Sequence, residues 1–356
     1  MLKKAFFKAV IFTLLLTLCI YGAGLVFQPK RVQLQPDTTA KVRGFYAEGK
    51  KSLDVVFCGT SKVFCLINPN QLWLEQGFTS YDFATNEQPL WITYYYVKEA
   101  LKYQKPKLIV LDVYCAAYGE EEPRNAVTRA GLDFLSLSPN KLEAALDNDA
   151  LKELPSYVFP LLRYHDRWSS LSKDDYKYAI YNAKNPMHGY SPMYMVNPQE
   201  KPEGLEGQPI GTLAPRAEEY LLKTIELIKS EGVDLLLLNT PYCISPQSQS
   251  KFNRVAQIAE EQGVPFLDCN LLLDDIGLDY SKDYIDLVHT NVVGSEKIGK
   301  YVGDYIKQNY TLPDSRGNPA YTWWEESAQL WLNYNAERLP TLGTAEADEK
   351  LEGLLL

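Results

Sequence analysis

Short apolar runs alternate with amphipathic stretches along most of the chain. Near-continuous runs of Leu, Val and Ile are typical of strands that are buried on both faces, as in a parallel sheet covered by helices. The pattern predicts strands at residues 53–58, 81–83, 108–113, 233–238 and 265–268, and helices at residues 61–76, 88–104, 215–230, 251–262 and 290–309. This alternation predicts an α/β fold, a three-layer flavodoxin-like parallel sheet with helices on both faces.

The longest apolar run lies near the N-terminus. Residues 9–27 carry no charge, and as a helix they would rise about 28 Å, close to a hydrocarbon core of about 30 Å. Lys3, Lys4 and Lys8 precede the run, which favours a cytoplasmic N-terminus, although two basic residues also follow it. We expect residues 1–28 to be an uncleaved signal anchor of a single-pass cell membrane protein whose remainder is extracytoplasmic. A cleaved signal peptide is the alternative.

The rest of the chain divides by composition. Residues 29–50 are polar and are expected to form a stalk, and residues 51–310 to form the α/β domain. Within that domain, residues 115–212 break the alternation with charged helical pieces and Pro/Gly-rich loops. We interpret this stretch as a helical insertion that caps or flanks the site. Residues 311–356 form an aromatic tail, in which the tryptophans predict a short helix packed on the body or on a partner.

Composition also bounds the partners. The net charge is −9, and an acidic surface argues against nucleic acid, because phosphate binding needs clustered Lys and Arg. The chain has six cysteines but no Cys-x-x-Cys pair and no Cys/His cluster with zinc-site spacing. We therefore expect neither a metal nor a cofactor. The many Tyr and Trp side chains suit sugar faces, and equally a core or an interface.

A serine follows the first predicted strand, in Gly59-Thr60-Ser61. Glycine permits a tight turn, and the start of the next helix supplies backbone N–H donors and a positive dipole end. This setting suits a nucleophile whose own N–H helps to bind an oxyanion. The alternative is that Ser61 only caps the helix, a common role for serine.

Asp286 and His289 lie just before the last predicted helix, and the chain has only three histidines. An Asp placed three residues earlier can accept a hydrogen bond from imidazole Nδ1–H, which fixes the tautomer and leaves Nε2 free to take a proton from serine. The prediction is a catalytic triad in which Ser61 is the nucleophile, His289 the general base and then acid, and Asp286 the orienting carboxylate. A structural loop histidine is the alternative.

The motifs Gly59-Thr60-Ser61 and Asp286-x-x-His289 resemble the first and last blocks of the SGNH/GDSL hydrolase superfamily. More narrowly, the layout is similar to its O-acyltransferase branch, which includes the alginate O-acetyltransferase type and teichoic acid D-alanyl transfer proteins. Residues 81–90 and 165–168 also resemble that branch. The resemblance covers about residues 53–114 and 233–309 and the membrane anchor. It implies an acyl donor delivered by a multi-pass membrane O-acyltransferase partner.

The resemblance further implies an oxyanion hole made by the serine N–H, a Gly in the second block and an Asn in the third. This chain has Thr85-Asn86 where that Gly is expected, and Asp112 and Tyr114 where Gly-x-Asn-Asp is expected. Asn86, through its backbone N–H or its side chain, is then the candidate for the second donor. These departures fit acyl transfer better than free esterase activity.

A second candidate site lies in the insertion, in His165-Asp166-Arg167-Trp168. Arg167 could bind an acceptor carboxylate or phosphate, and Trp168 could stack on a sugar. A packing and hydrogen-bonding node is the alternative, and His188, in a Pro/Gly loop, is expected to be solvated. The candidate oxyanion and substrate-binding residues are therefore Gly59, Thr60, Asn86, Tyr114, His165, Arg167 and Trp168.

The leading functional hypothesis is acyl transfer. Ser61 accepts an acyl group, in the leading form acetyl, and passes it to a hydroxyl of a cell-surface polysaccharide or teichoic acid-type polymer. An SGNH-type carbohydrate esterase is the first alternative. A non-catalytic protein that binds or assembles surface glycans is the second, because the oxyanion blocks are altered.

Overall fold

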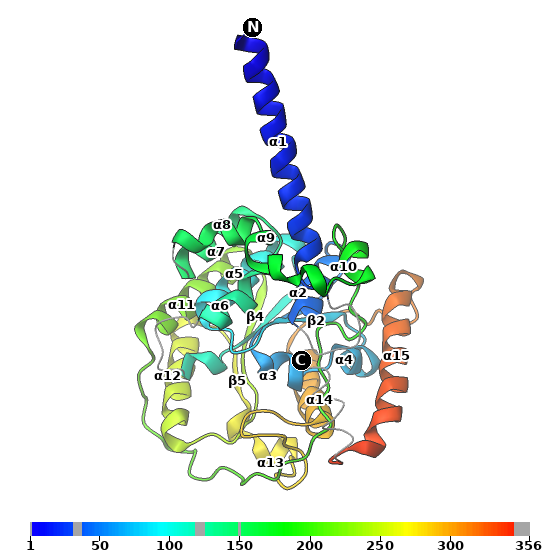
Figure 1. Cartoon of the computed structure of the whole chain (residues 1–356). Coiled ribbons are helices and arrows are strands. Elements are labelled where there is room, and N and C mark those ends of the chain that lie inside the picture. Colours follow the sequence, from blue (N-terminus) through cyan, green and yellow to red (C-terminus); the bar gives the residue numbers. More distant parts are fainter. Residues whose placement is uncertain (1, 31–37, 118–124, 149–150, 345–356) are drawn as a thin grey trace.

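The computed structural model describes residues 2–30, 38–117, 125–148 and 151–344. At the centre is a parallel sheet of five strands in the order β2-β1-β3-β4-β5 (Figure 1). The strands are β1 (Val55–Gly59), β2 (Ser80–Ala84), β3 (Leu108–Asp112), β4 (Asp234–Asn239) and β5 (Phe266–Asp268). This is the flavodoxin-like strand order, so the predicted fold class is confirmed.

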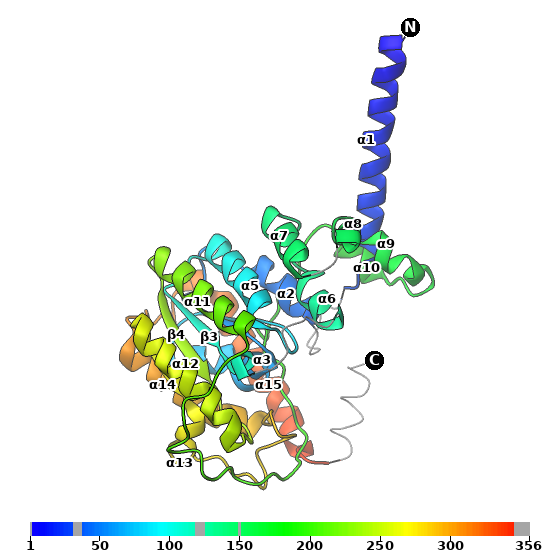
Figure 2. The ribbon, with the colours of Figure 1, turned by 90° about the vertical axis from the view of Figure 1, so that its left-hand side faces the viewer.

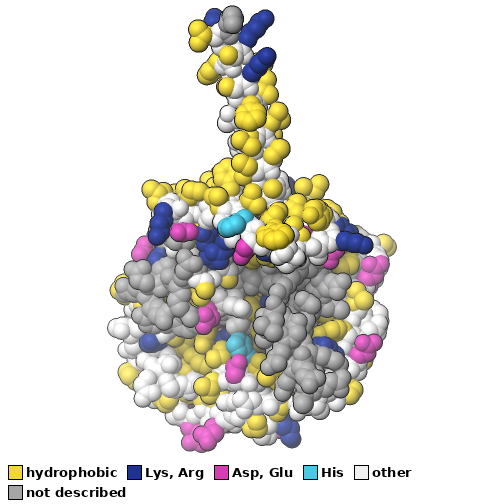
Figure 3. All heavy atoms as spheres, viewed as in Figure 1, with side chains coloured by type: hydrophobic (Ala, Val, Ile, Leu, Met, Phe, Trp, Pro, Cys, Tyr) yellow, Lys and Arg dark blue, Asp and Glu magenta, His cyan; other side chains and the backbone are white. Residues whose placement is uncertain are grey.

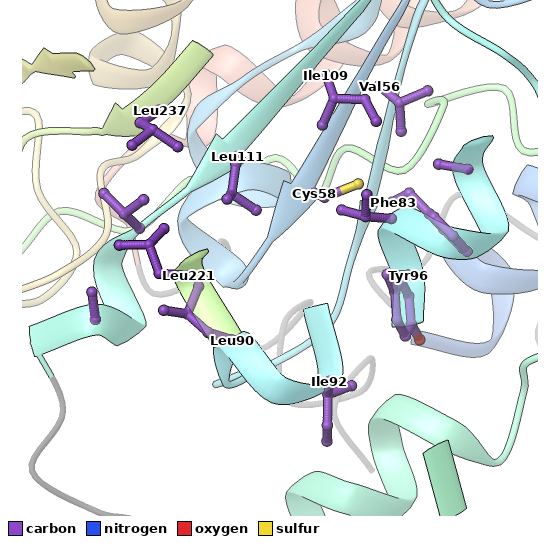
Figure 4. Packing of buried hydrophobic residues seen from close by; sticks show 14 of the residues in the cluster. Val56, Cys58, Phe83, Leu90, Ile92, Tyr96, Ile109, Leu111, Leu221 and Leu237 are labelled. Carbon is purple, nitrogen blue, oxygen red and sulfur yellow. The ribbon is translucent and has the colours of Figure 1, made fainter. Parts of the chain in front are cut away.

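Both faces of the sheet are largely apolar, because successive residues within β1, β3 and β4 point to opposite faces and are hydrophobic except at the strand ends. On one face Val56 and Cys58 pack with residues of α5 and α11 (Figure 4). On the other face Val55 and Phe57 pack beneath α14. The first layer is α5 (Leu90–Tyr103), α11 (Pro215–Ser230) and α12 (Pro246–Gln262), and the second is α3 (Ser61–Leu66), α4 (Pro69–Gln76) and α14 (Val292–Asn309). The expected three layers are therefore present.

The direction in which strands are added to the sheet reverses between β1 and β3. These strands are neighbours, with Cys58 beside Leu111. The chain leaves β1 toward β2 on one side and later builds β3, β4 and β5 on the other. Such a switch point is where open α/β sheets bind their ligands. Ser61 begins α3 directly after β1, and Asp112 closes β3.

One helix, α1 (Leu2–Phe27), projects from the body (Figures 1 and 2). It is long and apolar enough to cross a membrane, a test that a signal sequence also passes. Most of its side chains are exposed, and Gly24 is buried near the end that meets the body.

The expected stalk at residues 29–50 is wrong over α2 (Thr38–Ala47), which forms part of the body. Phe45 is fully buried in the core and stacks on Phe83, with the two ring centroids 3.8 Å apart. Apolar residues three and four positions apart give this short helix a stripe that packs on the sheet despite the polar composition. Residues 31–37 lie outside the described part of the chain.

The insertion has two parts. The first is a group of short helices: α6 (Asn125–Leu132), α7 (Pro139–Asn148), η2 (Leu151–Glu153), α8 (Leu154–Val158), α9 (Leu161–Tyr164), η3 (His165–Ser169) and α10 (Lys173–Lys177). The second is extended chain that runs beside the loop before α14. There Asn197 N–H donates to Tyr284 O at 2.8 Å and Gln199 N–H to Tyr280 O at 2.8 Å. The second part therefore flanks the loop that carries His289.

The C-terminal tail packs on the body through α15 (Thr322–Arg338), in which Trp324 and Trp331 are buried. His188 is also buried and stacks on Trp324, with the ring centroids 3.7 Å apart. The expectation that His188 is solvated is therefore wrong, because its loop is covered by this tail helix. The remaining short elements are η1 (Tyr114–Ala117), η4 (Cys269–Leu271), α13 (Leu273–Ile276), η5 (Pro319–Tyr321) and η6 (Leu339–Thr341).

Candidate active site

The turn that carries Ser61 is fixed by its two preceding residues. Gly59 has φ +153°, and a Cβ there would lie 2.4 Å from Cβ of Asp112, so only glycine fits. Thr60 is the N-cap of α3, and its Oγ1 accepts the N–H of Lys62 at 3.2 Å. Because Thr60 caps the helix, the alternative that Ser61 serves as the cap is excluded, and the Ser61 hydroxyl is available for chemistry.

Replacing Gly59 by Ala tests this turn. The new methyl group would overlap Asp112, so we expect a loss of about 1–3 kcal/mol in the free energy of unfolding, with a displaced Ser61 and lower activity. Gly232→Ala is the matched control, since Gly232 also has a positive φ but no atom within 4 Å of its would-be Cβ. Thermal unfolding of both variants would show Gly59→Ala as the less stable; equal stability would contradict the close contact.

Asp112 holds the serine turn from β3. Its Oδ2 accepts the N–H of Thr60 at 3.0 Å and the Thr60 hydroxyl at 2.6 Å, and its Oδ1 accepts the N–H of Tyr114 at 3.0 Å. Burial raises the pKa of Asp112, and these hydrogen bonds oppose that rise. Since the N–H groups of Thr60 and Tyr114 already donate to Asp112, neither is available to an oxyanion.

The histidine loop is a tight turn closed on itself. Tyr284 and Thr290 form an antiparallel bridge, and the N–H of Ile285 donates to the carbonyl of His289 at 3.0 Å. Asn291 then caps α14, accepting the N–H of Val293 at 3.1 Å. These contacts fix His289 at the start of the helix that covers α3.

Ser61, His289 and Asp286 are brought together from opposite ends of the domain. The Ser61 hydroxyl lies 2.7 Å from His289 Nε2, and His289 Nδ1 lies 2.9 Å from Asp286 Oδ2. Asp286 Oδ1 accepts the N–H groups of Val288 and His289, each at 2.7 Å. Partial burial would raise the pKa of Asp286, but the hydrogen bonds from His289 and from the backbone outweigh it and hold the pKa below its usual value. With Asp286 ionised, Nδ1 carries the imidazole proton and Nε2 accepts from Ser61.

One donor for an oxyanion is the N–H of Ser61 itself, and a second at Asn86 stays a prediction. Ser61 is the first residue of α3, where the backbone N–H has no partner within the helix. Ala84 pairs with Gly59 in the parallel register, and Thr85 N–H donates to Gly59 O at 3.3 Å. Asn86 therefore follows β2 at the level of Ser61, and it is exposed. Asn86 remains the candidate for the second donor.

The serine turn after β1 and the Asp-x-x-His loop before α14 correspond to the first and last blocks on which the resemblance to SGNH/GDSL hydrolases rests. No family model and no curated protein matches the chain. A solved GDSL-like lipase from Bacteroides thetaiotaomicron is 11% identical over 77% of this chain and 99% of that one, with a TM-score of 0.39. A catalytic mutant of an acetylxylan esterase from Geobacillus stearothermophilus is 13% identical over 74% of this chain and 97% of that one, with a TM-score of 0.37. The chemistry proposed below rests on this chain's own site.

A second set of serine, histidine and carboxylate lies elsewhere in the body and differs from the first in its exposure to solvent. His188 Nε2 lies 2.8 Å from the Ser327 hydroxyl, and Nδ1 lies 3.2 Å from Glu48 Oε1. All three side chains are buried, and Ser327 donates its proton to Trp324 O at 3.1 Å, away from the imidazole. This set joins α2, the insertion and α15 as a packing node. His289, by contrast, keeps 22% of its side chain exposed.

Sequence reasoning missed Lys62, the residue after the nucleophile. Its side chain is fully buried, and its Nζ donates to Pro241 O at 3.0 Å and lies 4.2 Å from the ring centroid of Tyr242. Tyr114 stands edge-on to Tyr242, 5.1 Å between centroids, and forms the other wall of this cage. Burial lowers the pKa of Lys62 to about 7, against the raising effect of Asp112. The signal in the sequence that could have indicated this burial is that Lys62 is a lone charged residue in an otherwise apolar stretch.

The buried ammonium predicts a pH-dependent stability. Between pH 7 and 10 the unfolded chain keeps the Lys62 proton that the folded chain gives up, so the wild type gains stability as the pH rises. The Lys62→Met variant has no titrating group at this position, so it lacks this gain in stability. Thermal unfolding of both chains should show the wild type gaining relative to the variant by a few kcal/mol from pH 7 to pH 10. A stability difference that is the same at both pH values would contradict the assignment.

The structure does not join the second candidate site to the triad. Arg167 donates to the backbone carbonyl of Phe27 at 2.5 Å and pairs with Asp175 at 3.2 Å, at the end of α1 that meets the body. Trp168 is 73% exposed in the same 3-10 helix, and His165 is exposed beside it. For Arg167 the alternative holds, since its guanidinium is engaged in a packing and hydrogen-bonding node.

Proposed function

We propose that the chain is a membrane-anchored, extracytoplasmic serine acyltransferase that forms an acyl ester on Ser61. The observation that carries the proposal is the 2.7 Å approach of the Ser61 hydroxyl to His289 Nε2, with Asp286 2.9 Å behind the imidazole. In its finer form the proposal is O-acetylation of a cell-surface polysaccharide or teichoic acid-type polymer. A multi-pass membrane O-acyltransferase would supply the acyl group.

The first half-reaction loads the serine. His289 Nε2 takes the hydroxyl proton as Ser61 Oγ attacks the donor carbonyl, and the N–H of Ser61 faces the oxyanion that forms. The donor's leaving group departs with the proton from His289 as the tetrahedral intermediate collapses. The product is acyl-Ser61, with Asp286 ionised throughout and the imidazole neutral again.

The second half-reaction unloads it. His289 takes the proton of an acceptor hydroxyl, whose oxygen attacks the acyl-Ser61 carbonyl. Collapse breaks the bond to Ser61 Oγ, which recovers its proton from His289. The extended second part of the insertion lies against the His289 loop, through Asn197 and Gln199. Chain at this position can exclude water from the ester and favour a sugar hydroxyl over hydrolysis.

Hydrolysis is the second candidate. It is favoured by one observation, that the side chain of Asp286 is half exposed, which places solvent next to the triad. Water would then replace the acceptor hydroxyl in the second half-reaction, and the chain would be an esterase that removes acetyl groups from a glycan.

The two outcomes are separated by measuring where the acetyl group goes. The full chain in detergent would receive p-nitrophenyl acetate and acetyl-free surface polysaccharides, and both free acetate and polymer-bound acetyl would be quantified. The proposal predicts Ser61-dependent acetyl on a polymer, with free acetate falling as the polymer concentration rises. Free acetate alone would make the chain an esterase, and no Ser61-dependent product would overturn both candidates.

A further inference from the structure

Large apolar side chains are exposed at one end of the body. Among the described residues beyond α1, eight of the fourteen exposed large hydrophobic side chains come from residues 137–181. They are Leu137, Leu146, Leu151, Leu162, Trp168, Tyr176, Ile180 and Tyr181, and we call them the collar. Figures 1 and 2 place α7 to α10 at the end from which α1 projects, and Figure 3 shows hydrophobic side chains gathered around the foot of that helix.

The last turns of α1 are built into this end of the body. A Cβ on Gly24 would lie 3.0 Å from Leu161 N, so glycine allows α1 to approach α9 closely. Gln28, just past the helix, donates to Asp133 O at 2.9 Å, and Arg167 donates to Phe27 O at 2.5 Å. These contacts fix the collar at a constant depth relative to α1.

The length of α1 then sets where the membrane surface lies. The uncharged run of residues 9–27 rises about 28 Å and just spans a hydrocarbon core of about 30 Å. Its last part, from Gly24, lies at the body, because Gly24 is buried against Pro160 and Leu161. If the collar stayed in water, only residues 9–23 would remain, about 22 Å of helix. That length is shorter than the hydrocarbon core. Entry of the collar into the apolar region makes up the difference without thinning of the bilayer or snorkelling of Lys8.

We propose that the collar inserts into the bilayer interface around α1, so that the occupant of this apolar surface is lipid. Residues 137–184 contain seven Lys and Arg and seven Asp and Glu, so their charges cancel and apolar contact supplies the attraction. The insertion of the collar is therefore independent of anionic lipid. It requires that α1 spans the membrane but not that Ser61 is catalytic, and it holds the body in one orientation on the bilayer.

The test uses the full chain in nanodiscs of phosphatidylcholine. Cys19→Ala removes the exposed cysteine of α1, and a cysteine is then introduced at Trp168 or Ile180 and labelled with an environment-sensitive fluorophore. Leu271→Cys is the matched control, because Leu271 is 45% exposed and adjoins α13, which Figures 1 and 2 place at the far end of the body. Nitroxide-bearing phosphatidylcholine is added as a quencher, and the Cys19→Ala chain without a new cysteine gives the background.

The expected result is a blue-shifted emission and quenching several-fold greater at positions 168 and 180 than at 271. The same ratio should hold when part of the lipid is phosphatidylglycerol. Equal quenching at collar and control positions would overturn the proposal and leave a protein partner as the cover of this surface. Collar quenching that needs phosphatidylglycerol would also contradict it, because the attraction would then be electrostatic.

Discussion

Ser61→Ala should abolish acyl transfer, with a loss in turnover on the order of 10⁴ to 10⁶. The variant lacks the atom that would form the ester, since Ser61 Oγ is the hydroxyl that meets His289 Nε2. Its fold should be unchanged, because Thr60 rather than Ser61 caps α3. The measurement is release of p-nitrophenol from p-nitrophenyl acetate, together with thermal unfolding of the same preparation.

Ser327→Ala is the matched control for this variant. Ser327 also bonds a histidine, His188, at 2.8 Å, but the pair is buried. Ser327→Ala should lower stability by about 1–3 kcal/mol, because it leaves the buried imidazole nitrogen without a partner, and should keep turnover. Turnover that survives in Ser61→Ala and fails in folded Ser327→Ala would reverse the assignment of the two sets.

Asp286→Asn should lower turnover by on the order of 10³ to 10⁴ without displacing the loop. Oδ1 of Asp286 accepts two backbone N–H groups at 2.7 Å, so the amide of the variant would keep its oxygen there. Its NH₂ group would then face His289 Nδ1 and donate to it. The imidazole would carry its proton on Nε2, where it could not accept the proton of Ser61.

Asp286→Glu separates this tautomer effect from a loss of the loop. A glutamate keeps an accepting carboxylate, so part of the activity should return, whereas the neutral amide cannot restore the tautomer. The readout is turnover of both variants between pH 6 and 9, with thermal unfolding as the check on the loop. Asn and Glu variants with equal turnover, or an Asn variant within tenfold of the wild type, would contradict an orienting role for Asp286.

The alternation of apolar runs predicted the sheet because β1, β3 and β4 are buried on both faces and lack polar residues in their interiors. The triad could be predicted because its members stand at local landmarks, Ser61 after a strand and Asp286 with His289 before a helix. These positions can be recognised from the local sequence alone, without knowing how distant segments pack.

Other roles depend on contacts that composition hides. Lys62 is charged, yet its side chain is buried because Tyr114, which follows β3, and Tyr242, which follows β4, enclose it. Arg167 looked like a ligand-binding residue, but its partners Phe27 and Asp175 come from α1 and α10. A stalk was predicted at α2 because its composition is polar and its apolar stripe consists of only three residues.

The most direct test of the central claim is to locate a covalent adduct. The full chain would be treated with a fluorophosphonate and with an activated acetyl ester, and intact mass and peptide mapping would compare wild type, Ser61→Ala and His289→Ala. The account predicts one adduct per wild-type chain, mapped to Ser61, and none on either variant. An unmodified wild type, or an adduct on another residue, would contradict the triad and turn attention to a non-catalytic role in glycan binding or assembly.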